Sequence, residues 1–278
     1  MHGGHNMQQK SRLAQVIRAG SAIALVVALG AVQQARAGSF DDFFTRIIRD
    51  DAGGIAALVQ RGFDPNTMND KGETGLTQAF KLDSYRAVKG LISLPATNVN
   101  LANAKGETPL MMAAIKGQLD LAKELIARGA DVNRPGWTPL HYAVSKASED
   151  DSDVKMIALL VEHHAYIDAA SPNGTTPLMM AAQYGSRSAV QKLLQEGADP
   201  KLKNQAGQTA TDFAERAERP EVVTWLAQAG GTTGGPNAAE GQPASKAAAQ
   251  PSNASGNLPN MTGPAFQQEG RKKIRSNW

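Results

Sequence analysis

Apolar residues in this chain recur at helical spacing in pairs of short stretches, and the clearest pair lies between residues 106 and 133. Its first stretch opens with Thr108 and Pro109. This pair is typical of the start of a helix, because a threonine hydroxyl can cap a helix and proline fits the first turn. In the second stretch, Leu121 and Leu125 lie four positions apart and are followed by Ala122 and Ile126 at the same spacing, which gives one helix face two apolar rows. A glycine follows each stretch. The pattern predicts two short helices separated by a turn, with a left-handed glycine cap at the end.

The same pattern repeats along the chain. Variants of one phrase, GETGLTQAF, GETPLMMAA, GWTPLHYAV and GTTPLMMAA, begin at glycines 72, 106, 136 and 174. The threonines that open the first helices are separated by 34, 30, 38 and 33 residues, and they are Thr74, Thr108, Thr138, Thr176 and Thr209. This period resembles that of the ankyrin-repeat family. The resemblance implies an all-α ankyrin solenoid of stacked helix-turn-helix units with β-hairpin loops.

One unit cannot bury its apolar face alone, so each unit covers its neighbour and the ends of the stack are polar or degenerate. The ankyrin-repeat domain is predicted over residues 38–230, with about four full units and two degenerate caps. The predicted units are 41–69, 70–103, 104–133, 134–170, 171–203 and 204–230. The first cap keeps only the second-helix half, IAALVQRGFDPN, and the last has TATDFAE in place of the usual opening.

Residues 1–37 have the layout of a signal peptide, with three early basic residues, a short apolar run and a final Ala-Arg-Ala. We predict cleavage after Ala37 and export by the general secretory route, since no twin arginine is present. A retained N-terminal anchor is the alternative, although the run is short for a bilayer span. The chain has no cysteine, so neither disulfides nor a cysteine-linked lipid can form. Exported ankyrin proteins of this layout resemble periplasmic proteins of Gram-negative bacteria, so we expect a periplasmic location.

The formal net charge of +3 belongs to the two ends of the chain. Residues 1–37 carry four basic residues and no acid, and residues 231–278 carry a net +3, which leaves −4 for residues 38–230. A nucleic-acid binder is expected to carry a basic patch on its folded domain, so this class is disfavoured. The composition of residues 231–278 predicts disorder. The basic end of this segment suggests either a solubilising tail or a weak membrane-surface contact through Arg271, Lys272, Lys273 and Arg275.

The polar residues of the domain suggest structural roles. The resemblance implies that His141 bonds a neighbouring hairpin, and that His164 replaces a glycine, so that its helix end is either strained or reshaped. The acidic run from Glu149 to Asp153 lies in an insertion over 147–153, and it lacks the spacing of a cation loop. We expect this insertion to be a solvated loop that caps a helix beginning near Val154, with a partner contact as the alternative.

The repeated methionine pairs, Met111–Met112 and Met179–Met180, suggest core packing in preference to copper binding or oxidation sensing. No activated nucleophile, paired carboxylates on one face or phosphate-binding glycine loop is present. We therefore expect no enzymatic activity, no metal and no cofactor.

The resemblance implies protein binding through the hairpin tips and first helices, which line a concave surface. Trp137 follows a hairpin three residues shorter than usual, so its indole either anchors a partner or packs on the adjacent hairpin. The predicted partner-binding residues are Lys105, Glu107, Lys116, Trp137, Lys146, Thr175, Gln183 and Tyr184. We expect a monomer that binds another protein. The alternatives are an inhibitor or immunity protein for a toxic enzyme and an envelope-associated scaffold.

Overall fold

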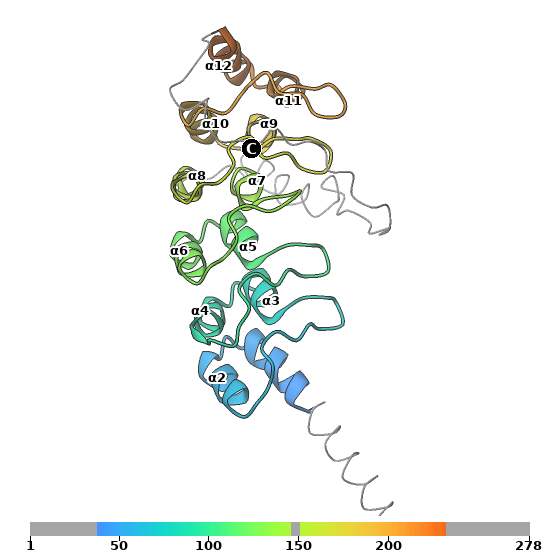
Figure 1. The fold of residues 1–278 in the computed structure, drawn as a ribbon, viewed down its shortest axis with the longest axis vertical. Helices are drawn as coiled ribbons and strands as arrows, with labels where there is room; N and C mark the ends of the chain where they lie inside the picture. Colours follow the sequence, from blue (N-terminus) through green and yellow to red (C-terminus); the bar gives the residue numbers. More distant parts are fainter. Residues whose placement is uncertain (1–37, 146–150, 232–278) are drawn as a thin grey trace, which may run out of the picture.

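The computed structural model describes residues 38–145 and 151–231, and its helices follow one another in six pairs (Figure 1). The pairs are 38–48 with α2 (Ala52–Gln60), α3 (Gly75–Lys81) with α4 (Tyr85–Ser93), α5 (Pro109–Ile115) with α6 (Leu119–Ala127), α7 (Pro139–Ala143) with α8 (Ser152–Glu162), α9 (Pro177–Tyr184) with α10 (Arg187–Gln195), and α11 (Ala210–Arg216) with α12 (Pro220–Gly231). We number the pairs units 1 to 6, over residues 38–69, 70–103, 104–133, 134–170, 171–203 and 204–231.

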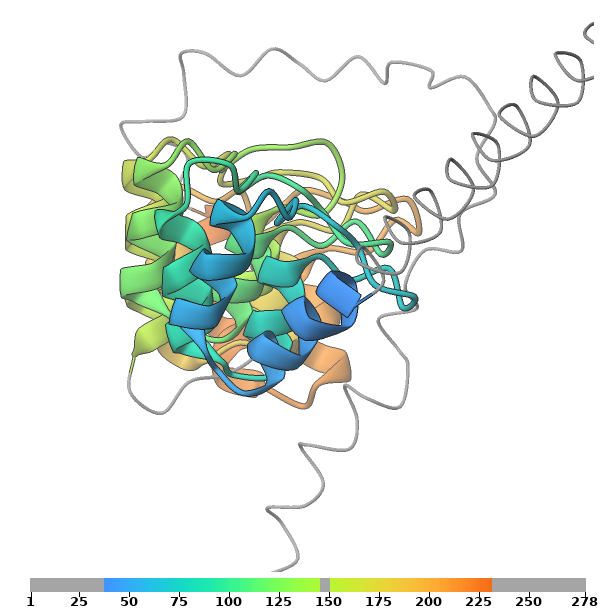
Figure 2. The same cartoon turned by 90° about the horizontal axis from the view of Figure 1, so that it is seen from below.

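The units stack into an elongated solenoid with two columns of helices. The first helices of the pairs form the inner column, the second helices form the outer column, and the connecting loops project beyond the inner column (Figures 1 and 2). Along the inner column, α3 packs on α5, α5 on α7, and α9 on α11. The loops are hairpin-shaped, but their only β-bridge within the described residues joins Met68 and Thr74. The all-helical solenoid predicted from the repeats is therefore present.

Threonine caps explain where the inner helices begin. The Thr108 hydroxyl accepts the backbone N–H of Met111 at 3.3 Å, and the Thr176 hydroxyl does the same for Met179 at 3.4 Å. The residue three positions after each threonine in turn accepts a hydrogen bond from the backbone N–H of that threonine. The acceptor is the Thr77 hydroxyl, the His141 ring or a methionine sulfur. Helices α3, α5, α9 and α11 thus each have two of their free N–H groups satisfied at the first turn.

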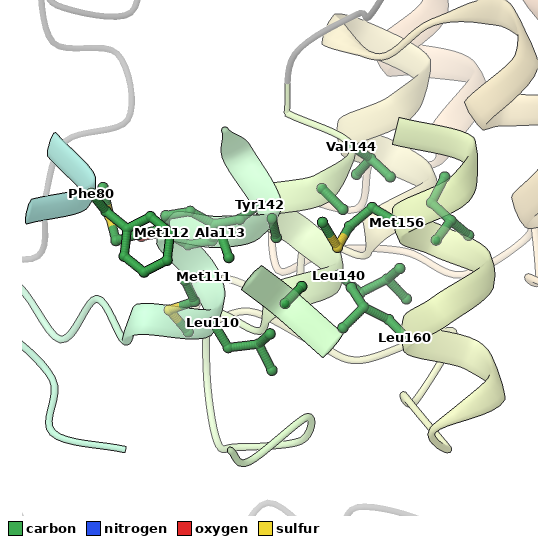
Figure 3. Close-up of a cluster of buried hydrophobic side chains, with 14 of the residues drawn as sticks. Phe80, Leu110, Met111, Met112, Ala113, Leu140, Tyr142, Val144, Met156 and Leu160 are labelled. Atoms are coloured by element: carbon green, nitrogen blue, oxygen red, sulfur yellow. The ribbon is translucent and has the colours of Figure 1, made fainter. Parts of the chain in front are cut away.

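The core is one continuous layer between the two columns, and Figure 3 shows its middle part. Leu110 and Met111 on α5 and Leu140 on α7 are each 1 % exposed, and Leu140 lies beside Met156 and Leu160 from α8 (Figure 3). Small residues such as Ala113 let the helices approach closely (Figure 3). All four paired methionines are at most 5 % exposed, so the predicted packing role is confirmed.

Unit 1 differs from the prediction because both of its helices are present. The helix over 38–48 buries Phe43 and Ile47 completely against the stack. Its sequence has apolar doublets in place of the Thr-Pro-Leu opening, which is why the repeat pattern missed it. Asp50 then closes the turn with a left-handed φ of 54°.

Two helix boundaries show how substitutions alter the turns between helices. His164 has a φ of 64°, so it takes the left-handed conformation usually left to glycine, and the helix end keeps the bonds seen at Gly129. Of the two predicted outcomes, this helix end is strained and not reshaped. Helix α8 begins at Ser152, two residues before the predicted start, and Asp151 precedes it with a φ of 54° and no capping bond from its side chain. Asp153 instead accepts the Val154 N–H at 2.8 Å.

Several predictions lie outside the described residues. They are the signal peptide over 1–37, Lys146 and most of the insertion over 147–153, and the tail cations Arg271, Lys272, Lys273 and Arg275. In the part of the chain that the structure describes, no helix combines the length and the apolar content needed to cross a membrane.

Candidate functional site

The loops and the exposed side of the inner helices together form one surface, which we call the concave surface (Figure 2). Between units 2 and 3 this surface carries an ordered polar network. Lys81 contacts Glu73 at 2.6 Å and Glu107 at 3.0 Å, and the Asn103 amide donates to both carboxylates. Thr77 also donates its hydroxyl to Glu73 at 2.9 Å.

The network keeps its charges in place. Burial alone would raise the pKa of Glu73, but hydrogen bonds from Lys81, Asn103 and Thr77 hold the pKa below its usual value. Burial would likewise lower the pKa of Lys81, yet the two carboxylates raise it. Glu107 was predicted to contact a partner. In the structure its carboxylate already forms an ion pair with Lys81 and accepts a hydrogen bond from Asn103. A partner must therefore meet this network as a unit.

The predicted lysines differ in their surroundings. Lys105 lies exposed at the tip of the loop between units 2 and 3, where only its backbone N–H is held, by Asn103. Lys116 at the end of α5 is half-buried and forms an ion pair with Asp83 at 2.9 Å. Both side chains remain on the concave surface, and Lys105 has the freer one.

Two predicted contact residues are less available than expected. Thr175 is 3 % exposed, because its N–H binds Ser171 and its carbonyl oxygen lies 2.9 Å from the His141 ring, so its side chain cannot be a main contact. Trp137 is half-buried and packs edge-on against His141, with ring centroids 5.2 Å apart. The shortened hairpin places this indole over its own helix, which favours packing over anchoring.

Gln183 and Tyr184 end helix α9 beside a hollow of about 490 Å³ between the helix turns of units 5 and 6. Tyr184 is 43 % exposed, and Gln183 is half-buried. Arg187 forms an ion pair with Glu221 at 2.8 Å, and Arg219 donates to the carbonyl oxygens of the last turns of α9. The hollow therefore places the exposed Tyr184 phenol beside two arginine side chains, Arg187 and Arg219, that already have bonding partners.

Leu82, at the end of α3, is a functional candidate that was not among the predicted partner-binding residues, although the resemblance places its position on the concave surface. It is 47 % exposed, and it lies at the helix-end position that Lys116 occupies in unit 3. The sequence signal was its place directly after the inner helix, where a leucine has no apolar neighbour to bury it. Leu82 and Tyr184 thus expose apolar groups at inner-helix ends in units 2 and 5.

The model of a family described as "Ankyrin repeats (3 copies)" matches the chain over residues 50–135, 76–170, 121–204 and 146–234. The chain belongs to the ankyrin-repeat family. Ankyrin-repeat domains are protein–protein interaction modules and are generally not catalytic, which agrees with the polar groups described above. Within the described residues, no three His, Asp or Glu side chains gather in a way that could hold a metal ion.

The chain spans only a small part of the length of the curated relatives that it matches. "Ankyrin repeat and SAM domain-containing protein 6" of Rattus norvegicus is 30% identical over 165 residues, which covers 59% of this chain and 15% of the relative. "Tyrosine-protein kinase Shark" of Drosophila melanogaster is 29% identical over 171 residues, covering 60% and 18%, respectively. "Neurogenic locus notch homolog protein 1" of Xenopus tropicalis is 30% identical over 158 residues, covering 55% and 6%. These relatives are animal proteins, and they do not support the resemblance to periplasmic bacterial proteins.

The ankyrin units are joined by a row of side chains at the base of the loops, which we call the rungs. Asn66 accepts the Asn98 N–H at 2.7 Å and donates to the Ala96 carbonyl oxygen at 2.9 Å. Asn100 makes the same two bonds to Asp131 and Gly129, and Asn133 makes them to Tyr166 and His164. Each of these rungs fixes one ankyrin unit to the next with one accepted and one donated bond.

Asp168 occupies the fourth rung, between units 4 and 5. Its carboxylate accepts the Asp199 N–H at 3.1 Å, but an ionised carboxylate has no hydrogen to donate. By register, the carbonyl that asparagine would bind belongs to Gly197. Burial raises the pKa of Asp168 to about 6, with the Asp199 carboxylate adding to the increase and the Asp199 N–H opposing it.

His141 joins the same two ankyrin units from the inner column. Its Nδ1 accepts the Thr138 N–H at 3.2 Å, so Nε2 carries the hydrogen and donates to the Thr175 carbonyl oxygen at 2.9 Å. Burial lowers the pKa of His141 to about 4, which keeps the ring neutral at pH 7. The predicted hairpin bond of this histidine is confirmed.

Proposed function

We propose that this ankyrin-repeat protein is an exported module that binds a partner protein through its concave surface, without catalysing a reaction. The observation that carries the proposal is the pair of exposed apolar side chains on that surface, Leu82 and Tyr184, at the ends of α3 and α9. Exposed aromatic and aliphatic groups flanked by ordered polar groups are typical of binding surfaces. The polar network around Lys81 supplies such ordered groups.

Capture of a partner tests the binding surface. The full chain carrying Leu82→Ser and Tyr184→Ser is compared with wild type as bait for envelope proteins, since both side chains already contact solvent and the fold should persist. We expect a partner that the wild type retains and the double variant loses by at least tenfold, because central apolar groups dominate binding free energy.

Tyr166→Ser is the matched control. Tyr166 is 53 % exposed, but it lies on the loop after the outer helix α8. Equal retention of the partner by wild type and the Leu82/Tyr184 variant, or equal loss in the control, would move the interface away from the concave surface.

Location is tested separately. We propose export with cleavage after Ala37, which rests on the sequence of residues 1–37. Expression in a Gram-negative host, osmotic release and N-terminal sequencing should give a released chain that starts at Gly38. Retention in the cytoplasm with residues 1–37 still attached would contradict export, but it would leave the proposed binding surface unaffected.

The same experiments distinguish the narrower roles. An inhibitor or immunity protein should form a stoichiometric complex with the captured partner and abolish its activity. A scaffold held at a membrane through Arg271, Lys272, Lys273 and Arg275 should lose membrane association when residues 231–278 are deleted, while still retaining the partner.

A further inference from the structure

The junction between ankyrin units 4 and 5 is built differently from the others on its inner side. Helix α7 has five residues, whereas the neighbouring inner helices α5 and α9 have seven and eight. Helix α7 packs only lightly against α9, although α5 packs broadly on α7 and α9 on α11. On the outer side, α8 and α10 pack against each other more broadly than α4 with α6 or α6 with α8 do.

The loops at three other junctions are also tied more firmly. The Ala104 N–H donates to Gly72 at 2.8 Å between units 2 and 3, and the Gln205 N–H donates to Asn173 at 3.0 Å between units 5 and 6. Arg134 reaches Gly106 at 3.0 Å between units 3 and 4. Lys81–Glu107 and Arg187–Glu221 add ion pairs at two of these junctions.

Between units 4 and 5, the polar links that the described residues show are the bond from His141 to Thr175 and the bond that Asp168 accepts from Asp199. No ion pair between described residues crosses this junction. The His141 bond lies on the inner side, where α7 and α9 contact each other only lightly. It therefore holds closed the side of the junction that packing leaves weakest.

We propose that units 5 and 6 form one body that tilts against units 1 to 4 about the contact between α8 and α10, with the His141–Thr175 hydrogen bond as the latch of this hinge. Opening the hinge separates the loop of unit 5 from that of unit 4 and lengthens the concave surface. Leu82 and Tyr184 lie on opposite sides of the hinge, so its angle sets their separation. The hinge is independent of which partner the protein binds.

Spin-label distances test the hinge directly, because the chain has no cysteine of its own and introduced cysteines label cleanly. Lys105→Cys and Ala206→Cys place labels at exposed loop tips on the two sides of the hinge. Lys71→Cys with Lys105→Cys places both labels on one side, as the matched control. We expect a broader distance distribution for the first pair, and His141→Met should broaden it further while leaving the control pair unchanged.

Methionine is the informative replacement, because Met111 and Met179 occupy the equivalent position and their sulfurs accept the threonine N–H. His141→Met thus keeps the helix cap and removes only the bond to Thr175. Hydrogen exchange of the same variant should be about fivefold faster in the unit 5 loop and the first turn of α9, with units 1 to 3 unchanged. Equal distributions for both label pairs, or uniform acceleration across all units, would overturn the hinge.

Discussion

The junction between units 3 and 4 and the junction between units 4 and 5 stack similar helices but hold them with different polar groups. At the first, Asn133 makes both rung bonds and Arg134 ties the loops together. At the second, Asp168 makes half of a rung, and His141 donates a separate bond to the Thr175 carbonyl oxygen on the inner side. The comparison shows that a repeat protein can lose a stabilising group from one layer of a junction and recover a bond in another. Asp168 and His141 both titrate, and their pKa values are shifted in opposite directions.

Removing His141 should have the largest effect on this comparison. We expect His141→Ala to lower the free energy of unfolding by about 3 kcal/mol, because it leaves a cavity and two unpaired backbone groups. His141→Met should cost about 1 kcal/mol, since only the Thr175 carbonyl loses its partner. Urea unfolding followed by tryptophan fluorescence measures both losses. Equal losses for the two variants would show that His141 stabilises the protein through packing alone.

Converting an intact asparagine rung into one that accepts a bond but donates none, like the Asp168 rung, should have the next largest effect. In Asn100→Asp the carboxylate keeps the bond from the Asp131 N–H but faces the Gly129 carbonyl oxygen without a hydrogen. We expect a loss of about 2 kcal/mol in the free energy of unfolding at pH 7. Asn98→Asp, at an exposed position of the same loop, is the control and should cost much less. If Asn100→Asp were as stable as wild type, the hydrogen bond that Asn100 donates to Gly129 would contribute nothing to the free energy of unfolding.

The rungs also show how far sequence reasoning reaches. The Thr-Pro-Leu phrase predicted where the inner helices begin, because capping is a local property of a few neighbouring residues. Asn66, Asn100 and Asn133 recur at nearly the same spacing and could have been recognised as linking residues. What each binds lies about thirty residues away, however, and only the stacked loops show it.

Exposure was harder to predict than structure. Thr175 stands where Glu107 and Gln208 stand in other units, but its short side chain turns inward and is 3 % exposed. The helix over 38–48 lacks the repeat phrase, and only its packing against unit 2 reveals that it completes unit 1. Both cases depend on contacts between units, which periodicity within one unit does not specify.

Restoring the fourth rung should stabilise the protein. We expect Asp168→Asn to raise the free energy of unfolding by about 1 kcal/mol at pH 7, because the amide can donate to the carbonyl of Gly197. Asp131→Asn, on the exposed loop of unit 3, is the matched control and should change little. A destabilising Asp168→Asn would show that the carboxylate serves a contact other than the rung.

The pH dependence of this gain follows from the two opposed titrations. Because the pKa of Asp168 is raised to about 6, the folded protein takes up a proton there as pH falls, and stability is gained from pH 6 down to its ordinary value of 3.8. Because the pKa of His141 is lowered to about 4, the unfolded chain takes up that proton first, and stability is lost from pH 6.5 down to 4. Wild type should therefore vary less than Asp168→Asn over this window. Urea unfolding at pH 7, 5.5 and 4 should show the advantage of the variant shrinking with each step, whereas a constant advantage would contradict the raised pKa.

The smallest effect is expected at the last rung position, Lys201. This residue leads into unit 6, whose outer helix α12 runs to Gly231, so no loop within the described residues offers the carbonyl and N–H that a rung binds. Lys201→Asn should therefore change the free energy of unfolding by less than about 0.5 kcal/mol, as exposed substitutions usually do. The measurement is the same urea titration at pH 7. A gain as large as that of Asp168→Asn would mean that asparagine stabilises its own loop, and the benefit of the rungs would then arise within a unit instead of between units.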